Sequence, residues 1–140
     1  MALFLAGWHI EPMPLQWTID VENRFMTAVA TGDVTRAEVD GFLDAVMANK
    51  ALGYRKLFDA GRADTSMDPG DLVALGTRMR SMHFEGAMGP LALVAPAGQG
   101  EPLERLFGMI AAADRPMRLF RKVGRARLWI EEQVSRAVPG

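Results

Sequence analysis

Four aspartates lie within a short stretch in the middle of the chain, and their side chains are the first that could support chemistry. Asp59 ends an apolar run, Asp64 follows it in a polar segment, and Asp68 and Asp71 flank Pro69-Gly70. Carboxylates gathered near one loop can bind a cation such as magnesium, but this spacing matches no known metal-binding loop. Asp68 and Asp71 also suit the first turn of a helix, where the helix dipole favours negative charge. We therefore predict no metal site here.

The same polar segment carries a cation and two hydroxyl groups. Arg62 lies among the acids and can pair with one of them, and Thr65 and Ser66 precede the expected start of a helix. In an α/β sheet, ligands collect outside the carboxyl ends of the strands, at strand-to-helix segments of this kind. We therefore assign a candidate ligand or partner surface to Asp59, Arg62, Thr65, Ser66 and Asp68.

Methionine is abundant, with ten residues in the chain. Met79, Met82 and Met88 cluster with Phe84 around the end of the helix expected after Asp68. Flexible thioethers suit an adaptable apolar pocket or a partner surface, and they equally well fill gaps in a core. Both interpretations stay open at this point, and the candidate surface is extended to Met79, Met82 and Phe84.

Three further patterns carry weaker signals. The segment Gly98-Gln99-Gly100 offers backbone amides for a phosphate, although an ordinary turn before a helix is the favoured explanation. Two histidines, His9 and His83, lie in different expected elements without a serine-and-acid set, so a hydrolase triad is not predicted. Six cations late in the chain are expected to form a solvated face. These cations are Arg115, Arg118, Arg121, Lys122, Arg125 and Arg127. We predict no catalytic residue, no cofactor and no enzymatic activity.

The composition is that of an ordinary globular domain. The chain has 140 residues, of which 49% are hydrophobic and 24% are charged. This length predicts one domain. The net charge of -1 provides no field that would attract nucleic acid or an anionic membrane. The absence of cysteine excludes disulfides and fits a cytoplasmic location.

The first 14 residues are expected to form a segment that packs on a domain spanning residues 15–140. Residues 2–10 are apolar, but no basic residue precedes them and no span of membrane-crossing length follows. Pro14 ends this segment because proline interrupts strand pairing. We expect no stable membrane insertion.

Hydrophobic spacing predicts the elements of this domain. Alternation over 15–21 and an apolar run over 25–31, joined by a short polar turn, indicate an antiparallel hairpin. Thr35 and Glu38 have the spacing of a capping box at the start of a helix. Further strands are expected at 55–60, 90–96 and 117–123, with a loop at 61–67. Helices are expected at 35–50, from 68 to before Gly86, at 102–113 and at 124–138.

The resulting order is ββαβαβαβα. Helices that alternate with strands indicate a mostly parallel sheet, to which the first hairpin adds an antiparallel pair. The predicted fold is a mixed α/β domain with a five-stranded sheet and about four helices.

Several segments, in this order, resemble the STAS-like proteins, the group related to the SpoIIAA-like anti-sigma-factor antagonists. They are Ile19-Asp20, 24–32, Val34 to Glu38, Leu57 to Ala60, Leu91 to Val94, Leu119 to Arg121 and Ala126 to Ile130. The resemblance covers residues 15–132 and implies a sheet with helices packed against it.

One feature of the antagonist branch is missing from this sequence. In that branch, a serine just before the second helix is phosphorylated to control partner binding, but here Asp68 and Pro69 stand at the matching positions. Asp68 is expected to be a helix N-cap. The resemblance implies a non-enzymatic regulatory or protein-interaction module, expected to be a homodimer. The alternative, which the resemblance also implies, is a protein that holds an apolar, lipid-like molecule in a pocket rich in methionine and phenylalanine.

Overall fold

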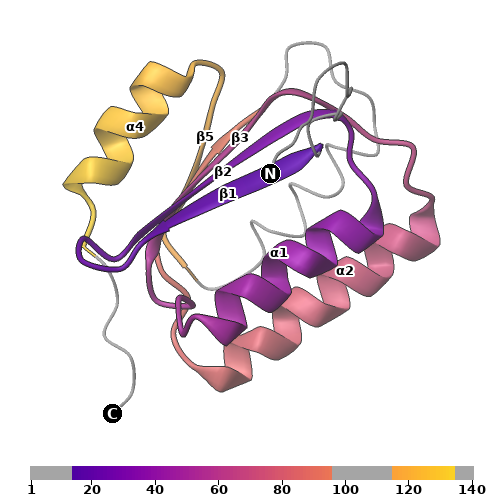
Figure 1. Ribbon diagram of the computed structural model, residues 1–140, viewed down its shortest axis with the longest axis horizontal. Helices are drawn as coiled ribbons and strands as arrows, with labels where there is room; N and C mark the ends of the chain where they lie inside the picture. Colours follow the sequence, from indigo (N-terminus) through magenta and orange to yellow (C-terminus); the bar gives the residue numbers. More distant parts are fainter. Residues whose placement is uncertain (1–13, 96–114, 135–140) are drawn as a thin grey trace, which may run out of the picture.

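The computed structural model describes residues 14–95 and 115–134 and has the predicted order of elements over these ranges (Figure 1). The strands are β1 (Leu15–Asp20), β2 (Phe25–Asp33), β3 (Arg55–Asp64), β4 (Leu91–Val94) and β5 (Met117–Phe120). The helices are α1 (Arg36–Ala48), α2 (Pro69–Met82), the short 3-10 helix η1 (His83–Glu85) and α4 (Val123–Glu132). The helix expected at 102–113, the segment Gly98-Gln99-Gly100 and residues 1–13 lie outside the described residues.

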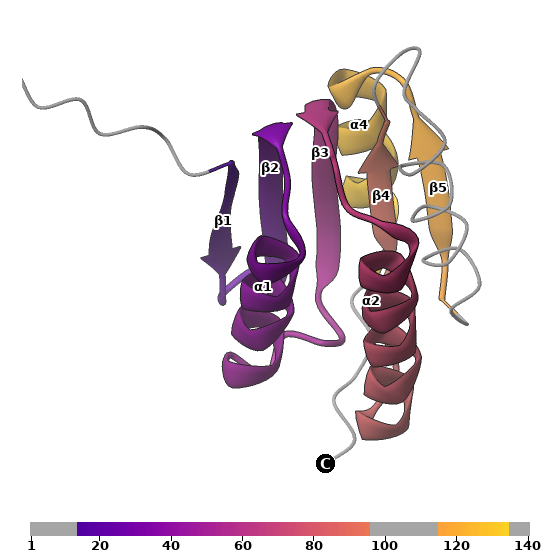
Figure 2. The same ribbon diagram turned by 90° about the vertical axis from the view of Figure 1, so that its right-hand side faces the viewer.

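The five strands form one sheet in the order β1-β2-β3-β4-β5 (Figure 2). The first hairpin is antiparallel, with Leu15 opposite Ala30, and the three other pairings are parallel. This confirms the predicted mixed α/β fold. All four residues of β4 are buried, as expected for an apolar strand with a neighbour on each side.

Helices cover both faces of the sheet. Helices α1 and α2 lie side by side on one face, and α4 lies on the other (Figures 1 and 2). Because strand side chains alternate, the two faces have separate cores. Met26 and Ala28 of β2 face the α1–α2 layer. On the opposite face, Leu57 of β3 and Val94 of β4 pack with Ile130 of α4.

The two predicted helix starts are confirmed. Thr35 and Glu38 form a capping box at α1, in which the Glu38 amide donates to the Thr35 hydroxyl at 3.3 Å. Asp68 is the N-cap of α2, and its carboxylate accepts a hydrogen bond from the Asp71 amide at 2.8 Å. Pro69 occupies the first turn, where a missing amide hydrogen costs nothing.

Several predicted boundaries are wrong. The strand expected at 117–123 ends at Phe120, and Val123 is already the first residue of α4. Strand β3 continues to Asp64 instead of ending at Ala60, so most of the predicted 61–67 loop is strand. The extension pairs with a prolonged β2 after a register shift between Val29 and Thr31, and this long-range pairing leaves no local signal. Helix α4 ends at Glu132, and Val134, expected in the core, is 82% exposed.

Candidate functional site

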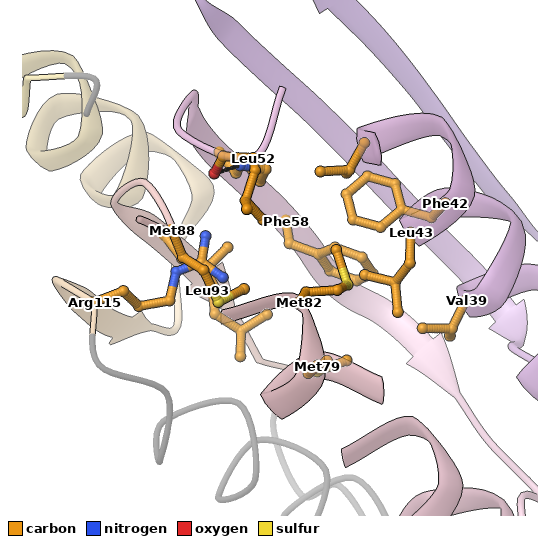
Figure 3. Close-up of a pocket in the computed structure, with 13 residues that line it drawn as sticks. Val39, Phe42, Leu43, Leu52, Phe58, Met79, Met82, Met88, Leu93 and Arg115 are labelled. Carbon is orange, nitrogen blue, oxygen red and sulfur yellow. Dashed lines mark hydrogen bonds between the residues drawn. The ribbon is translucent and has the colours of Figure 1, made fainter. Parts of the chain in front are cut away.

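An apolar cavity of about 70 Å³ lies between α1, α2 and the sheet (Figure 3). Helix α1 lines it at the spacing of a single helix face, with Val39, Phe42, Leu43 and Val46. The remaining lining residues in the described part of the chain come from α2, the sheet and the connecting segments. They are Leu52, Lys56, Phe58, Met79, Met82, Met88, Leu91, Leu93 and Arg115. The described part of the lining is therefore hydrocarbon and thioether apart from two cationic side chains.

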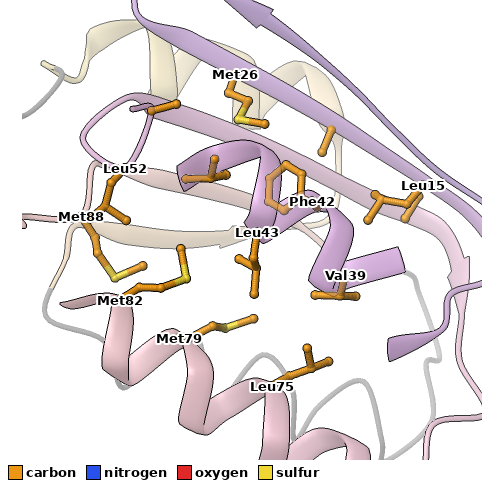
Figure 4. Close-up of a cluster of buried hydrophobic side chains, with 14 of the residues drawn as sticks. Leu15, Met26, Val39, Phe42, Leu43, Leu52, Leu75, Met79, Met82 and Met88 are labelled. Atoms are coloured by element: carbon orange, nitrogen blue, oxygen red, sulfur yellow. The ribbon is translucent and has the colours of Figure 1, made fainter. Parts of the chain in front are cut away.

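Aromatic and methionine side chains shape this space. The Phe42 ring packs edge-on against Phe58 of β3, with 5.6 Å between ring centroids. Met79, Met82 and Met88 lie across from Leu43 in the same buried cluster (Figure 4). Methionine has three rotatable bonds and fills irregular gaps, so this wall can adapt its shape.

Lys56 is the buried cation of the cavity, with 5% of its surface exposed. Its Nζ donates hydrogen bonds to the carbonyl oxygens of Leu52 at 2.8 Å and Tyr54 at 3.0 Å. Burial, and after it the nearby Arg115 guanidinium, lower the pKa of Lys56 well below its ordinary value of 10.5. Among the described residues, no carboxylate forms an ion pair with Lys56.

A close backbone contact holds the same end of the cavity. The Gly89 amide donates to the Leu52 carbonyl at 2.9 Å, and Arg115 Nε donates to the Gly89 carbonyl at 2.7 Å. A Cβ atom at position 89 would collide with the carbonyl oxygens of Gly53 and Tyr54. Only glycine allows this approach. Lys56 and Arg115 are therefore tied to the same 52–54 turn.

The volume bounds what the cavity can hold. A water molecule needs about 10–15 Å³ by this measure, and an apolar cavity of about 150 Å³ can bind benzene. At about 70 Å³, the cavity is less than half the size of that benzene site and has room for only a few heavy atoms as it stands. A longer chain requires the methionine side chains to move aside.

The predicted residues between β3 and α2 form a closed hydrogen-bond set. The Thr65 hydroxyl donates to the Val34 carbonyl at 2.7 Å, and the Ser66 amide donates to the Asp33 carboxylate at 2.9 Å. Asp68 caps α2 as described above. The structure thus places Thr65, Ser66 and Asp68 together at the surface, away from the cavity lining.

Asp59 and Arg62 lie in a separate open groove of about 370 Å³, at the carboxyl ends of the inner strands, together with Arg121. The Asp59 carboxylate accepts a hydrogen bond from the Gly61 amide at 3.0 Å. No ion pair joins Arg62 to an acid of the described residues. Within residues 14–95 and 115–134, no group of three acids or histidines is arranged to hold a metal ion.

The residues predicted to form a pocket or partner surface rich in methionine and phenylalanine do not all lie at the cavity. Met79 and Met82 line the cavity, whereas Phe84 is 91% exposed and does not. Most of the late cations are exposed, as expected for a solvated face, but Arg115 is half-buried at the cavity.

Sequence reasoning missed Lys56. A usable signal was the pair Arg55-Lys56, because alternation sends neighbouring strand residues to opposite faces. In an inner strand with helices on both faces, each of two adjacent cations must point toward a covered face. Here Lys56 faces the α1–α2 layer, and Arg55 reaches the end of α4, where it donates to the Glu131 carbonyl at 3.2 Å.

The chain is similar to a crystal structure of an uncharacterized protein from the DUF3478 family with a SpoIIAA-like fold, from Shewanella loihica PV-4. The sequences are 17% identical and the TM-score is 0.52, with 89% of this chain and 99% of that chain covered. No family model matches the sequence, and no curated protein matches it. At this identity the likeness shows the fold alone. The chain has a SpoIIAA-like fold, as its sequence resemblance implied.

No helix within the described residues is long and apolar enough to cross a membrane.

Proposed function

We propose that this chain is a non-enzymatic STAS-like module that binds a small apolar molecule between α1, α2 and the sheet. The observation that carries the proposal is the apolar cavity of about 70 Å³. A concave, mostly apolar site with a few polar groups is the usual form of a small-molecule site. Met79, Met82 and Met88 supply an adaptable wall, so ligands of different lengths can be accommodated.

Binding is favoured over catalysis by the chemistry of the lining. Among the described residues that line the cavity, only Lys56 and Arg115 are ionisable, and both are cations. No carboxylate, histidine or hydroxyl side chain lies among these described lining residues, so Lys56, even with its lowered pKa, has no partner acid, base or nucleophile to act with. Lys56 directs its nitrogen to two backbone carbonyl oxygens, a bonding pattern suited to holding a polar group in place.

A cavity-filling substitution tests this proposal. Val39→Phe adds a ring to a buried position that lines the cavity, and Val73→Phe makes the same change at a position of α2 that is 57% exposed. We expect Val39→Phe to weaken binding of small apolar probes, such as straight-chain alcohols, by about tenfold or more. Val73→Phe should leave their affinity unchanged. Titrations followed by the methyl resonances of labelled methionines measure both affinities.

Two controls make the result decisive. Thermal unfolding of both variants shows whether the domain still folds, and the resonances of Met79 and Met82 report directly on the cavity. If saturating alcohol leaves those resonances of the wild-type protein unmoved, the cavity is not a binding site. Equal weakening by both substitutions would also contradict the proposal.

A second function, a protein-interaction module that forms a homodimer, is supported by a different observation. The Phe84 ring is 91% exposed, which is unusual for a large apolar side chain. A single exposed aromatic ring can act as an anchor that inserts into a pocket of a partner. Because Asp68 is hydrogen-bonded as a helix cap, this proposal requires no phosphorylated serine at that position.

Analytical ultracentrifugation tests the homodimer. We expect the wild-type protein to dimerise as its concentration rises and Phe84→Ser to shift the equilibrium toward the monomer by about tenfold. Val73→Ser, at another exposed apolar position, is the control and should dimerise normally. A wild-type protein that stays monomeric at every concentration would rule out this arrangement.

A further inference from the structure

Lys56 differs from the rest of the cavity wall because it is a buried lysine that forms no ion pair with a carboxylate of the described residues. Its side chain is 5% exposed, and within the described residues no carboxylate contacts it. Both influences on its pKa, burial and then the Arg115 guanidinium, act against the charged form. An ion removed from water is costly unless it is paired and hydrogen-bonded. A ligand that brings a negative charge would provide the missing partner.

The geometry leaves room for such a partner at Lys56. An ammonium group has three hydrogen-bond donors. Two of them are used by the carbonyl oxygens of Leu52 and Tyr54. The third donor of a charged Lys56 has no acceptor among the described residues, and the Lys56 side chain is one of those that line the cavity.

The two ends of the cavity differ in chemistry. Arg115 and Met88 lie on one side of the cavity in Figure 3, and Val39 lies on the opposite side. The Nζ of Lys56 is hydrogen-bonded to the 52–54 turn. The Gly89 amide is hydrogen-bonded to the same turn, and Arg115 is hydrogen-bonded to the Gly89 carbonyl. The two residues that carry a cationic group therefore border the cavity at this turn, and the opposite end lies between α1 and Met79 of α2.

We propose that the ligand of this cavity is a small aliphatic carboxylic acid, whose carboxylate pairs with Lys56 and whose tail lies along Met79, Met82 and Val39. This inference rests on the proposed function, since it names the ligand class of the same cavity. Charge-assisted hydrogen bonds are shorter and about twice as strong as neutral ones, so the pairing would favour an acid over an alcohol of equal length.

The competing explanation is that Lys56 only ties β3 to the 52–54 turn. In that case its bonds to Leu52 and Tyr54 are complete, and an acid gains nothing over a neutral molecule. The two explanations differ in what they predict for matched ligands, and they can be separated by varying the ligand's charge at constant length.

The experiment titrates straight-chain carboxylates from butanoate to octanoate, and the matching alcohols, into protein labelled at its methionine methyl groups. It uses the wild-type protein, Lys56→Met and Lys50→Met. Methionine replaces the lysine stem with an apolar chain, and Lys50 is an exposed lysine on which the same replacement serves as control. Thermal unfolding shows that each variant is folded.

We expect wild type and Lys50→Met to bind each acid about tenfold or more tightly than its alcohol, because one charge-assisted bond distinguishes them. Lys56→Met should lose this preference and keep its affinity for alcohols. The inference would be overturned if acids bind the wild type no better than alcohols, or if Lys56→Met keeps the preference for acids. The proposed apolar binding site would still be supported in either case. Binding of neither class would instead remove the proposed function.

A second measurement covers the case in which Lys56→Met does not fold. A bound carboxylate favours the charged lysine, so binding should raise the pKa of Lys56 and draw a proton from solution. Calorimetric titration of octanoate into the wild type, in buffers of different ionisation enthalpy, measures this proton uptake. A bound acid that causes no proton uptake anywhere between the lowered pKa of Lys56 and 10.5 would overturn the inference.

Discussion

Lys56 shows at the residue scale how burial changes the chemistry of one side chain. Its pKa is lowered well below 10.5 by burial and, second, by Arg115, whereas the unfolded chain exposes an ordinary lysine. Between the lowered pKa and about 10.5, the unfolded state therefore binds more protons than the folded state. Stability rises with pH wherever the unfolded state binds more protons.

This sign gives a measurable pH dependence. Across the window between the lowered pKa and about 10.5, the unfolding free energy of the wild type should increase with pH relative to that of Lys56→Met. Below and above the window the difference should be constant. Urea unfolding of both proteins at a series of pH values measures it, and using the difference cancels the other titrating groups. Parallel stability curves over the whole alkaline range would show that Lys56 has an ordinary pKa in the folded state.

The residues of the β3–α2 connection were predictable in one respect. Asp68 was identified as a helix cap because the signal is local: an aspartate, a proline and a second acid within four positions. The bonds of Thr65 to Val34 and of Ser66 to Asp33 join segments that are distant in sequence. Residue types alone do not specify such partners.

At the scale of elements, an ion-pair network joins the two helices that enclose the cavity. Arg78 of α2 donates to the Asp40 carboxylate at 2.9 Å and to the Asp40 carbonyl at 3.0 Å, and it also pairs with Asp44. Arg36 of α1 reaches Asp71 of α2 at 3.6 Å. The Arg78 side chain is half-buried, so its pairs are less screened than those of a fully exposed side chain.

Removing this connection should loosen α1 from α2. We expect Arg78→Leu to lower the unfolding free energy by about 1–2 kcal/mol, since it removes charge-assisted bonds that are partly buried. Arg80→Leu, at an exposed position of the same helix, should change it by less than about 0.5 kcal/mol. Urea unfolding at low and high salt measures both effects. Equal losses for the two variants would mean that the network contributes no specific stability.

The sequence predicted the element boundaries that depend on neighbouring residues and missed one that depends on a distant strand. The starts of α1 and α2 follow from capping residues that lie next to them. The end of β3 does not, because residues 61–64 are held as strand by pairing with β2 beyond a register shift. Polar residues in that segment suggested a loop, but a strand partner supplied by the tertiary structure overrides this weak local preference.

At the scale of the whole molecule, a five-stranded sheet with helices on each face separates the buried clusters of its two faces (Figure 2). The cavity belongs to the core under α1 and α2, where methionines replace branched side chains along much of one wall. The groove that holds Asp59 and Arg62 lies instead at the open carboxyl edge of the strands. The candidate residues drawn from one stretch of sequence are thus distributed between different parts of the surface and the interior.

Within residues 14–95 and 115–134, the sequence by itself determined the order of elements, the mixed sheet and the two capped helices, and its resemblance to the STAS-like proteins implied the SpoIIAA-like fold. Hydrophobic periodicity and helix capping depend on residues that are close together in the sequence, so both can be recognised without the structure.

The tertiary structure alone decided that a cavity exists, that Lys56 faces it, and that Arg115 and Gly89 meet at its polar end. These features arise from side chains brought together by packing between segments far apart in the chain. A cavity is the space that such packing leaves unfilled, so it has no local pattern from which it could be predicted.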